Sequence, residues 1–328
     1  MPVVSVIIPL YNKEKYILRT INSILNQTFQ DFEVIVVDDG STDKSADVVR
    51  GFVDPRIKLI RQENRGSSPT RNRGIYESTG ELLAFIDADD EWLPIHLETL
   101  LDLRKRYPDA GIYSDRYTIQ TPKGERPVNY QAIPNDKRDC LIPNFFECVA
   151  KGDLPVNSSS AGIPRLVFEK YGGFPLAAWG EDMGLFARIA FDYPVAFSWN
   201  YGSIYHWDAE NRVSNTLELI SYEREPIVIE GMVALNTNSV SPLFAPFLKE
   251  FIAQCEINRA LWNIKAGKPK KAREILRDCN SPLFYRRKIR LLVFSYIPSP
   301  VFRFLWKSIR TIKQYLFNHD YSKDPWLK

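Results

Sequence analysis

Short apolar runs alternate with amphipathic segments over the first 113 residues, and this order is the strongest constraint on the fold. Each run has the length of a buried strand, and each segment between runs has the apolar spacing of a helix. The runs are at residues 3–8, 32–37, 57–60, 82–86 and 110–113, and helices are expected at 13–26, 42–52, 69–78 and 93–106. The pattern predicts an α/β domain with a Rossmann-like, mostly parallel sheet flanked by helices, whose ligands bind beyond the carboxyl ends of the strands.

The periodicity fades between about residues 120 and 157, where Pro, Asn and charged residues predict a long loop region. Further helices are expected at residues 166–171 and 181–192, followed by a strand at 195–199. These elements would complete a first domain that we assign to residues 1–215.

A helical extension is expected after this domain. Two helical patterns between residues 246 and 279 are separated by Gly267-Lys268-Pro269, a sequence that ends one helix and begins the next. We therefore expect a helical region at residues 216–280 and a distinct C-terminal segment at residues 281–328.

The C-terminal segment carries most of the positive charge. Residues 281–328 contain ten Lys and Arg against two acidic residues, a net charge of +8, and the chain's total of +3 leaves −5 for the remainder. Its apolar residues Leu305, Ile309, Ile312 and Leu316 recur at helical spacing. A basic amphipathic helix of this kind suits the surface of an anionic membrane, although a helix docked on the protein with its charges in water is the alternative. The charge is too localised to indicate a nucleic-acid surface.

The cysteines and the N-terminal sequence indicate the cellular compartment of the protein. The four cysteines include no C-x-x-C pair and only three histidines are present, which argues against a zinc site or a disulfide framework. A reducing cytosol fits this usage. The chain begins with a strand pattern rather than an export signal, and its apolar stretches are too short to span a bilayer. We therefore expect a cytoplasmic protein, peripheral on the inner face of the cell membrane.

Three carboxylates follow the fourth apolar run. Asp87, Asp89 and Asp90 stand where a strand should end. Mg²⁺ and Mn²⁺ prefer oxygen ligands, and proteins commonly hold them with one or two carboxylates while substrate phosphates and waters complete the coordination. The cluster predicts a metal-bound diphosphate, whereas a turn or a helix N-cap is the structural alternative.

Other strand ends carry groups that suit a nucleotide. Tyr11 follows the first strand, where its ring could stack on a base, and Asp38-Asp39 ends the second strand, where Asp39 could accept hydrogen bonds from a base or ribose. The turn after the third strand, residues 64–74, has three arginines near the start of a helix, whose free N–H groups favour anions. An aromatic ring, an acid pair, a basic turn and a metal-type cluster together predict a site for a nucleoside diphosphate.

Four motifs resemble those of family 2 glycosyltransferases, which have the GT-A fold. They are V-S-V-I-I-P-L-Y-N at 4–12, V-V-D-D-G-S-T-D at 36–43, R-N-R-G at 71–74 and D-A-D-D at 87–90. The resemblance covers roughly residues 3–215 and implies an inverting, metal-dependent transfer of a sugar from a nucleoside diphosphate, UDP in our prediction, to an acceptor hydroxyl. It assigns the nucleotide sugar to Pro9, Tyr11, Asp38, Asp39, Arg71, Asp87 and Ala88. It assigns Mn²⁺ or Mg²⁺ to Asp89.

A later segment is similar to the acceptor-side motif of the same family. Gly172-Gly173-Phe174 precedes Trp179-Gly180-Glu181-Asp182, and by this similarity Trp179 and Glu181 lie beside the acceptor while Asp182 is the catalytic base. If a helix begins at residue 181, its spacing also places Asp182 on the face that points toward the protein interior. The alternative is that Glu181 and Asp182 only complement the helix dipole.

His206 falls where family members often carry a histidine near the metal or diphosphate, and a structural histidine is the alternative. Residues 211–214 resemble a segment that can close over the donor in this family, although the family's usual Pro-Gly step is replaced here by Asp208-Ala209-Glu210.

The basic C-terminal segment makes a lipid-linked saccharide in surface-polysaccharide biosynthesis the expected acceptor. Two other functions fit parts of the pattern. One is a catalytically silent, membrane-associated scaffold with the same fold. The other is a haloacid-dehalogenase-like phosphotransferase, although its D-x-D motif follows the first core strand rather than the fourth.

Overall fold

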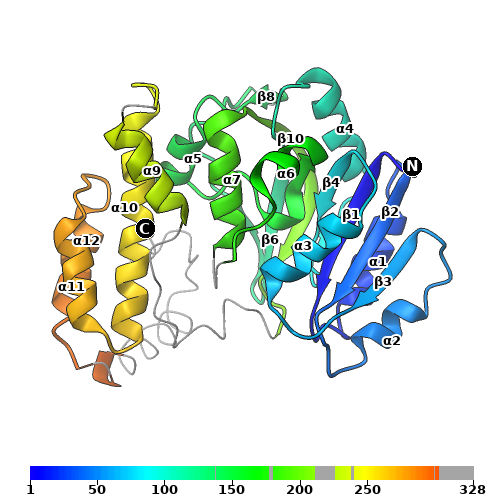
Figure 1. The fold of residues 1–328 in the computed structure, drawn as a ribbon, viewed down its shortest axis with the longest axis horizontal. Helices are drawn as coiled ribbons and strands as arrows, with labels where there is room; N and C mark the ends of the chain where they lie inside the picture. Colours follow the sequence, from blue (N-terminus) through cyan, green and yellow to red (C-terminus); the bar gives the residue numbers. More distant parts are fainter. Residues whose placement is uncertain (137, 177–179, 211–225, 238–239, 299, 303–328) are drawn as a thin grey trace. The chain divides into compact units, whose positions relative to one another are not determined.

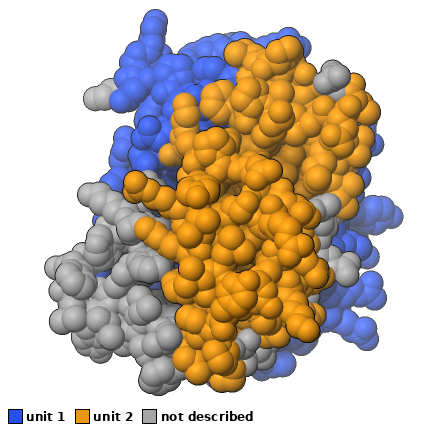
Figure 2. Space-filling view, turned by 90° about the vertical axis from the view of Figure 1, so that its left-hand side faces the viewer, with its two compact units in different colours: residues 1–148, 152–212 blue, residues 149–151, 213–328 orange. Residues whose placement is uncertain are grey.

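The computed structural model describes residues 1–328 except 137, 177–179, 211–225, 238–239, 299 and 303–328. The chain forms two compact units, which are coloured separately in Figure 2. Unit 1 contains residues 1–148 and 152–212, and unit 2 contains residues 149–151 and 213–328.

Strands and helices alternate through the first half of unit 1, as the apolar runs predict (Figure 1). The elements are β1 (Val4–Leu10), α1 (Ile17–Leu25), β2 (Phe32–Asp38), α2 (Ser45–Arg50), β3 (Ile57–Arg61), α3 (Ser67–Glu77), β4 (Leu82–Phe85), β5 (Glu91–Trp92), α4 (His96–Arg106) and β6 (Ile112–Thr121). They are followed by β7 (Gly124–Pro127), β8 (Cys140–Leu141), α5 (Phe145–Lys151), the 3₁₀ helix η1 (Ser158–Ser160), β9 (Ala161–Pro164), α6 (Arg165–Tyr171), α7 (Glu181–Asp192) and β10 (Val195–His206).

The strands form one mixed sheet in the order β3-β2-β1-β4-β9-β6-β10-β5, with β7 beside β6 and β8 beside β10. The half built from β3, β2, β1 and β4 is parallel, because each strand is followed by a helix that returns the chain across the sheet. In the other half, β9 is antiparallel to both β4 and β6, while β10 runs parallel to β6. The architecture confirms the predicted α/β class with its flanking helices.

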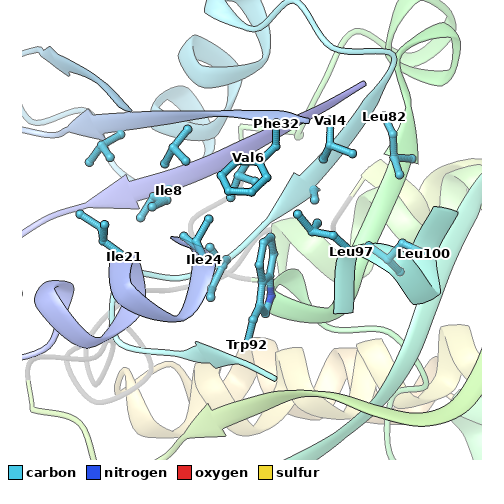
Figure 3. Packing of buried hydrophobic residues seen from close by; sticks show 14 of the residues in the cluster. Val4, Val6, Ile8, Ile21, Ile24, Phe32, Leu82, Trp92, Leu97 and Leu100 are labelled. Atoms are coloured by element: carbon cyan, nitrogen blue, oxygen red, sulfur yellow. The ribbon is translucent and has the colours of Figure 1, made fainter. Parts of the chain in front are cut away.

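The two faces of β1 contact different helices. Figure 3 shows Val4, Val6 and Ile8 of β1 on the same side as Ile21 and Ile24 of α1, and all of them are buried in the main core. The same core includes Leu97 and Leu100 of α4, which shows that α1 and α4 cover this face.

The opposite face is covered by α3 and α6. An added Cβ at Gly74 of α3 would lie 2.4 Å from Cγ2 of Ile7, so only glycine permits this close approach of helix to strand. The ring of Phe85 in β4 packs edge-on against Phe168 of α6 and against Phe174, with centroid distances of 5.8 and 5.2 Å. This second core holds the start of α3 over the carboxyl ends of the parallel strands.

Several elements differ from the sequence-based expectation. The region expected to be a long loop contains β7, β8 and α5. The two strands are short and have no buried position, and α5 has only seven residues, too few to give a clear periodic pattern. The strand expected at 195–199 continues to His206, and two register shifts against β6 separate its two halves. Exposed Asn200 and Tyr201 lie in this irregular stretch and interrupt the apolar run.

Unit 2 is helical where it is described. It contains α9 (Pro226–Asn236), α10 (Ala245–Lys265), α11 (Pro269–Asp278) and α12 (Tyr285–Phe294). The turn between α10 and α11 is a Schellman motif: Gly267 has φ +77°, and the N–H groups of Gly267 and Lys268 donate to the carbonyls of Ile264 and Asn263. Pro269 then begins α11, as expected for a proline at a first helical position. Apolar residues of α10, α11 and α12 form a separate core.

Among the helices of the described chain, none combines the length and the apolar composition needed to cross a bilayer.

Candidate active site at the carboxyl ends of the strands

The sheet topology explains which predicted side chains meet. Strands β1, β2, β4 and β10 point the same way, so Leu10, Asp38, Phe85 and His206 end at one edge of the sheet. Because β9 runs against its neighbours, it begins at that same edge, and η1 lies immediately before it. The acid cluster after β4 is therefore surrounded by residues from distant parts of the sequence.

Arg71 joins the donor-side and acceptor-side motifs. Its guanidinium donates to Oδ1 of Asp87 at 2.7 Å and to Oε1 of Glu181 at 2.8 Å, and its side chain is 6% exposed. It also lies over the ring of Phe174 at 5.3 Å. Burial lowers the pKa of Arg71, but the nearby carboxylates raise it by more, so the guanidinium stays protonated. Arg71 therefore brings Asp87 close to the residue that precedes Asp182.

Asp90 links the acid cluster to two other elements by hydrogen bonds. Its carboxylate is fully buried, accepts a hydrogen bond from the hydroxyl of Ser159, and accepts another from the backbone N–H of His206 at 2.8 Å. Burial, together with the negative charges of Asp89 and Asp87, raises its pKa well above the ordinary value. These bonds connect the acid turn to η1 and to the end of β10.

Asp89 forms an ion pair with Lys13. The lysine Nζ lies 2.7 Å from Oδ2 of Asp89, and each side chain is 11% exposed. The same Nζ donates to the backbone carbonyl of Glu210 at 2.9 Å. Glu210 is further held by Lys15 and by the hydroxyl of Tyr16, which accepts its N–H. The position beside Asp89 thus already suits a cation.

The donor groups near Asp89 fit a divalent cation in part. Nε2 of His206 is buried and has no hydrogen-bond partner among the described residues. It lies 3.6 Å from a carboxylate oxygen of Glu91, while Nδ1 lies 3.2 Å from Asp208. An imidazole nitrogen held in this way is a suitable ligand, because its other nitrogen is already oriented by a carboxylate. Within the described residues, however, no three His, Cys, Asp or Glu side chains converge as a complete metal site. The protein would have to share the ion with the diphosphate.

The acid pair at the end of β2 accepts hydrogen bonds from two turns. One oxygen of Asp38 accepts the N–H of Ser41 at 3.0 Å, and the other lies 3.3 Å from Nε of Arg61. Asp39 accepts the backbone N–H groups of Arg65 and Gly66, both at 2.9 Å, and the side-chain amide of Gln62 at 2.8 Å. A carboxylate has about four acceptor positions, so about one remains on Asp39 for a ligand.

The remaining donor-side residues lie at the same edge. Tyr11 is 45% exposed just beyond β1, which leaves its ring accessible to a base. Pro9 is in β1 and pairs in register with Val37. Ala88 is buried, and its carbonyl accepts the hydroxyl of Thr20 at 3.1 Å.

Asp182 lies in the first turn of α7, next to the Glu181–Arg71 ion pair. Its carboxylate accepts the hydroxyl of Ser158 at 3.3 Å and the N–H of Met183 at 2.7 Å. Burial raises its pKa to about 6, and the neighbouring charge of Glu181 adds to the shift, while Arg71 opposes it. A carboxylate with this pKa is charged at neutral pH and is a stronger base than an ordinary aspartate. Trp179, predicted on the acceptor side, lies outside the described residues.

Sequence reasoning missed Lys13 and the serines of η1. Ser158 contacts Asp182, while Ser159 contacts Asp90 and accepts the N–H of Asp87 at 3.1 Å. The only signal in the sequence was the run of three serines before an apolar segment, which carries no information on partners. Lys13 lies two residues after Tyr11 in the same turn, but a charged residue there also suits a solvated loop.

Comparison with known proteins finds similarity to glycosyltransferases over part of the chain. Residues 5–154 match the family model described as glycosyl transferase family 2. The putative glycosyltransferase EpsH of Bacillus subtilis is 43% identical over 157 residues, which are 46% of this chain and 45% of that protein. The chain spans less than half the length of the curated relatives that it matches.

Two solved structures share the fold. TarS 1–349 of S. aureus, determined in complex with UDP-GlcNAc, has a TM-score of 0.62 at 16% identity, covering 94% of this chain and 91% of that one. The mannosyltransferase PcManGT of Pyrobaculum calidifontis, in complex with GDP-Man and Mn²⁺, has a TM-score of 0.57 at 19% identity, covering 97% and 88%. The comparisons confirm the resemblance of residues 5–154 to family 2 glycosyltransferases, and the solved structures confirm the GT-A fold.

Proposed function

Because residues 5–154 match glycosyl transferase family 2, we propose that this chain transfers a sugar from a nucleoside diphosphate sugar to an acceptor hydroxyl, with inversion at the anomeric carbon. One observation carries the proposal. Arg71 binds both Asp87, in the acid cluster after β4, and Glu181, the neighbour of Asp182. The candidate donor groups and the candidate base are therefore parts of one site.

Asp182 acts as the general base in this proposal. Its carboxylate takes the proton of the acceptor hydroxyl while the acceptor oxygen forms a bond to the anomeric carbon. The bond from that carbon to the diphosphate breaks on the opposite side, and its electron pair leaves with the nucleoside diphosphate. A pKa of about 6 suits this role, because the group is charged at neutral pH and remains basic enough to accept a proton.

Asp89 and His206 would hold Mn²⁺ or Mg²⁺ together with the donor diphosphate. When bound, the ion would neutralise the charge that develops on the leaving group. Within the chain, the Asp89 carboxylate attracts a cation, as its pairing with Lys13 illustrates, and the orientation of His206 is maintained by Asp208.

The donor is proposed to be UDP-linked. TarS was solved with UDP-GlcNAc and PcManGT with GDP-Man, so both neighbours bind nucleoside diphosphate sugars. In this chain, Tyr11 would stack on the base, Asp39 would use its remaining acceptor position, and Pro9, Asp38 and Ala88 would shape the surrounding backbone.

A lipid-linked saccharide is the proposed acceptor, as in surface-polysaccharide biosynthesis. The net charge of +8 on residues 281–328 supports a peripheral position on the inner, anionic face of the cell membrane, where such an acceptor would be presented.

A panel of nucleotide sugars tests the proposal. Purified chain is incubated with UDP- and GDP-linked sugars in Mn²⁺ or EDTA, and the released nucleoside diphosphate is measured. We expect Mn²⁺-dependent release with at least one donor, retained in Asp192→Asn at the far end of α7 and lost in Asp182→Asn. A silent scaffold would bind donors without turnover. Release of inorganic phosphate from a phosphoester, with no nucleoside diphosphate, would indicate the phosphotransferase.

A further inference from the structure

Trp92 is a buried residue that no step of the proposed reaction uses. Its side chain is 2% exposed and lies in the main core of unit 1 (Figure 3). Its backbone N–H donates to the hydroxyl of Ser23 in α1 at 3.1 Å. Its indole Nε1–H donates to the backbone carbonyl of Ser159 in η1 at 2.7 Å. A core tryptophan is therefore bonded directly to the 3₁₀ helix that contacts the candidate site.

Ser159 extends this contact to the acid cluster. Its hydroxyl donates to the carboxylate of Asp90 and accepts the backbone N–H of Asp87 at 3.1 Å. Asp90 in turn accepts the backbone N–H of His206 at 2.8 Å. A displacement of η1 would therefore disturb hydrogen bonds at the acid turn and at the end of β10.

A buried His–Asp pair packs against the ring of Trp92. The imidazole of His96 lies against the indole, with a centroid distance of 4.4 Å. Its Nδ1 lies 2.7 Å from Oδ2 of Asp115, and both side chains are fully buried. An added Cβ at Gly202 would lie 1.7 Å from the same oxygen, so glycine leaves room for the carboxylate. Because replacing a buried pair by apolar side chains is often neutral or stabilising, stability alone does not explain this pair.

We propose that Trp92 is a positioning residue. Its indole N–H fixes η1, and Ser159 of η1 then holds the acid cluster in the arrangement that binds the donor. His96 and Asp115 keep the indole in the orientation that this bond requires. The inference rests on the proposed function, because it takes the acid cluster to be the place where the donor diphosphate binds. The alternative is a core tryptophan whose N–H only satisfies a buried carbonyl.

Nucleotide binding by the full chain tests the proposal. Trp92→Phe removes the N–H donor and keeps an aromatic ring in the core. Trp199→Phe is the matched control, because Nε1 of Trp199 also donates to a backbone carbonyl, that of Pro134 at 2.8 Å. Calorimetry in Mn²⁺ gives the Kd for UDP and for GDP. For the nucleotide that binds, we expect Trp92→Phe to raise the Kd about fivefold, as loss of one hydrogen bond does, and Trp199→Phe to leave it within about twofold. Equal Kd values in these two variants would overturn the proposal.

A double-mutant cycle tests the route through Ser159. Ser159→Ala removes the hydroxyl that contacts Asp90 and should raise the Kd about as much as Trp92→Phe does. The double variant should stay within about twofold of Ser159→Ala, because the contact through which Trp92 acts is already lost. Independent effects would instead multiply to about 25-fold and would exclude this route. A Kd of Ser159→Ala within about twofold of the wild-type value would also exclude it, even if Trp92→Phe did not fold.

Hydrogen exchange without metal or nucleotide provides a readout that does not depend on sugar transfer. Backbone amides of residues 86–91 should exchange faster in Trp92→Phe than in wild type, because the N–H of Asp87 loses a fixed acceptor, while those of β2 should be unchanged. Equal acceleration in β2 would indicate a general loss of stability, and no acceleration would show that Trp92 does not fix η1. Either result would contradict the proposal. Local acceleration in a chain that binds neither UDP nor GDP would support the positioning role and count against the proposed function.

Discussion

At the scale of single residues, Arg71 supplies the positive charge that offsets the carboxylates of the candidate site. It lies between Asp87 and Glu181, and its positive charge opposes the shift that burial imposes on Asp182. Without such a charge, three carboxylates this close together would favour protonation of at least one. Arg71 therefore favours the ionised form of Asp182, the proposed base.

The pH dependence of transfer should report on Asp182. Its pKa is about 6 and it must be deprotonated to act, so the rate should rise as pH increases through 6 and level off above it. Removing the charge of Glu181, which raises this pKa, should move the rise to lower pH in Glu181→Gln. The rate constant under saturating donor and acceptor, measured from pH 4.5 to about 8, checks both expectations. An unshifted rise in Glu181→Gln, equal to that in the control Asp192→Asn, would separate Asp182 from the pH dependence.

Replacing the base itself should separate catalysis from binding. We expect Asp182→Asn to lower the transfer rate by about 10² to 10⁴, the usual contribution of a general base, and to leave donor affinity within about threefold. Calorimetry and a transfer assay on the same preparation provide the two numbers. Turnover near the wild-type value would remove Asp182 from the role of base.

Lys13 should compete with a divalent ion for Asp89. In Lys13→Met the carboxylate loses its ammonium partner at 2.7 Å, so Mn²⁺ should bind more tightly in the absence of nucleotide. Electron paramagnetic resonance of free Mn²⁺ measures this affinity directly. Lys15→Met is the matched control, because Lys15 pairs with Glu210 at the surface instead. Equal or weaker Mn²⁺ binding in Lys13→Met would contradict the competition.

At the scale of elements, the sequence predicted the strands and helices of residues 4–106 except the two-residue β5, and it placed the acid cluster after β4. It could not predict the order of the later strands. The insertion of β9 between β4 and β6 brings η1 beneath Asp87 and Asp90, but β9 has only four residues and no alternating pattern. Contacts such as that of Ser158 with Asp182 depend on that insertion, so no local sequence pattern predicts them.

The close packing of α3 against β1 at Gly74 can be tested by substitution. An exposed Gly→Ala change within a helix stabilises it by about 1 kcal/mol, but at Gly74 the new Cβ would lie 2.4 Å from Ile7. We expect Gly74→Ala to lower the free energy of unfolding by about 1–3 kcal/mol, as overpacked core sites do. Urea denaturation measures the change.

The control is Gly51→Ala at the end of α2. Gly51 has a helical φ of −69°, and the atom nearest to its added Cβ is a backbone oxygen 3.2 Å away. This variant should be close to neutral. Stabilisation by Gly74→Ala would contradict the packing described for α3.

At the scale of the whole molecule, the two units differ in their motifs and in their charge. The motifs that resemble family 2 glycosyltransferases lie in unit 1, whereas the basic segment from residue 281 onward belongs to unit 2. The concentration of basic residues in this segment is visible from composition. The contacts of Arg287 and Lys288 inside unit 2 are not, because helical spacing alone does not reveal them.

The proposed transfer depends on the acid cluster after β4 binding a donor diphosphate together with a metal ion. The most direct measurement is a calorimetric titration with the nucleoside diphosphate that the donor panel identifies, in Mn²⁺ and in EDTA, for wild type, Asp89→Asn and the surface control Asp47→Asn. We predict that Mn²⁺ strengthens binding about tenfold or more in wild type and Asp47→Asn, and that this gain disappears in Asp89→Asn. Equal affinity of the wild-type chain in Mn²⁺ and in EDTA would contradict it.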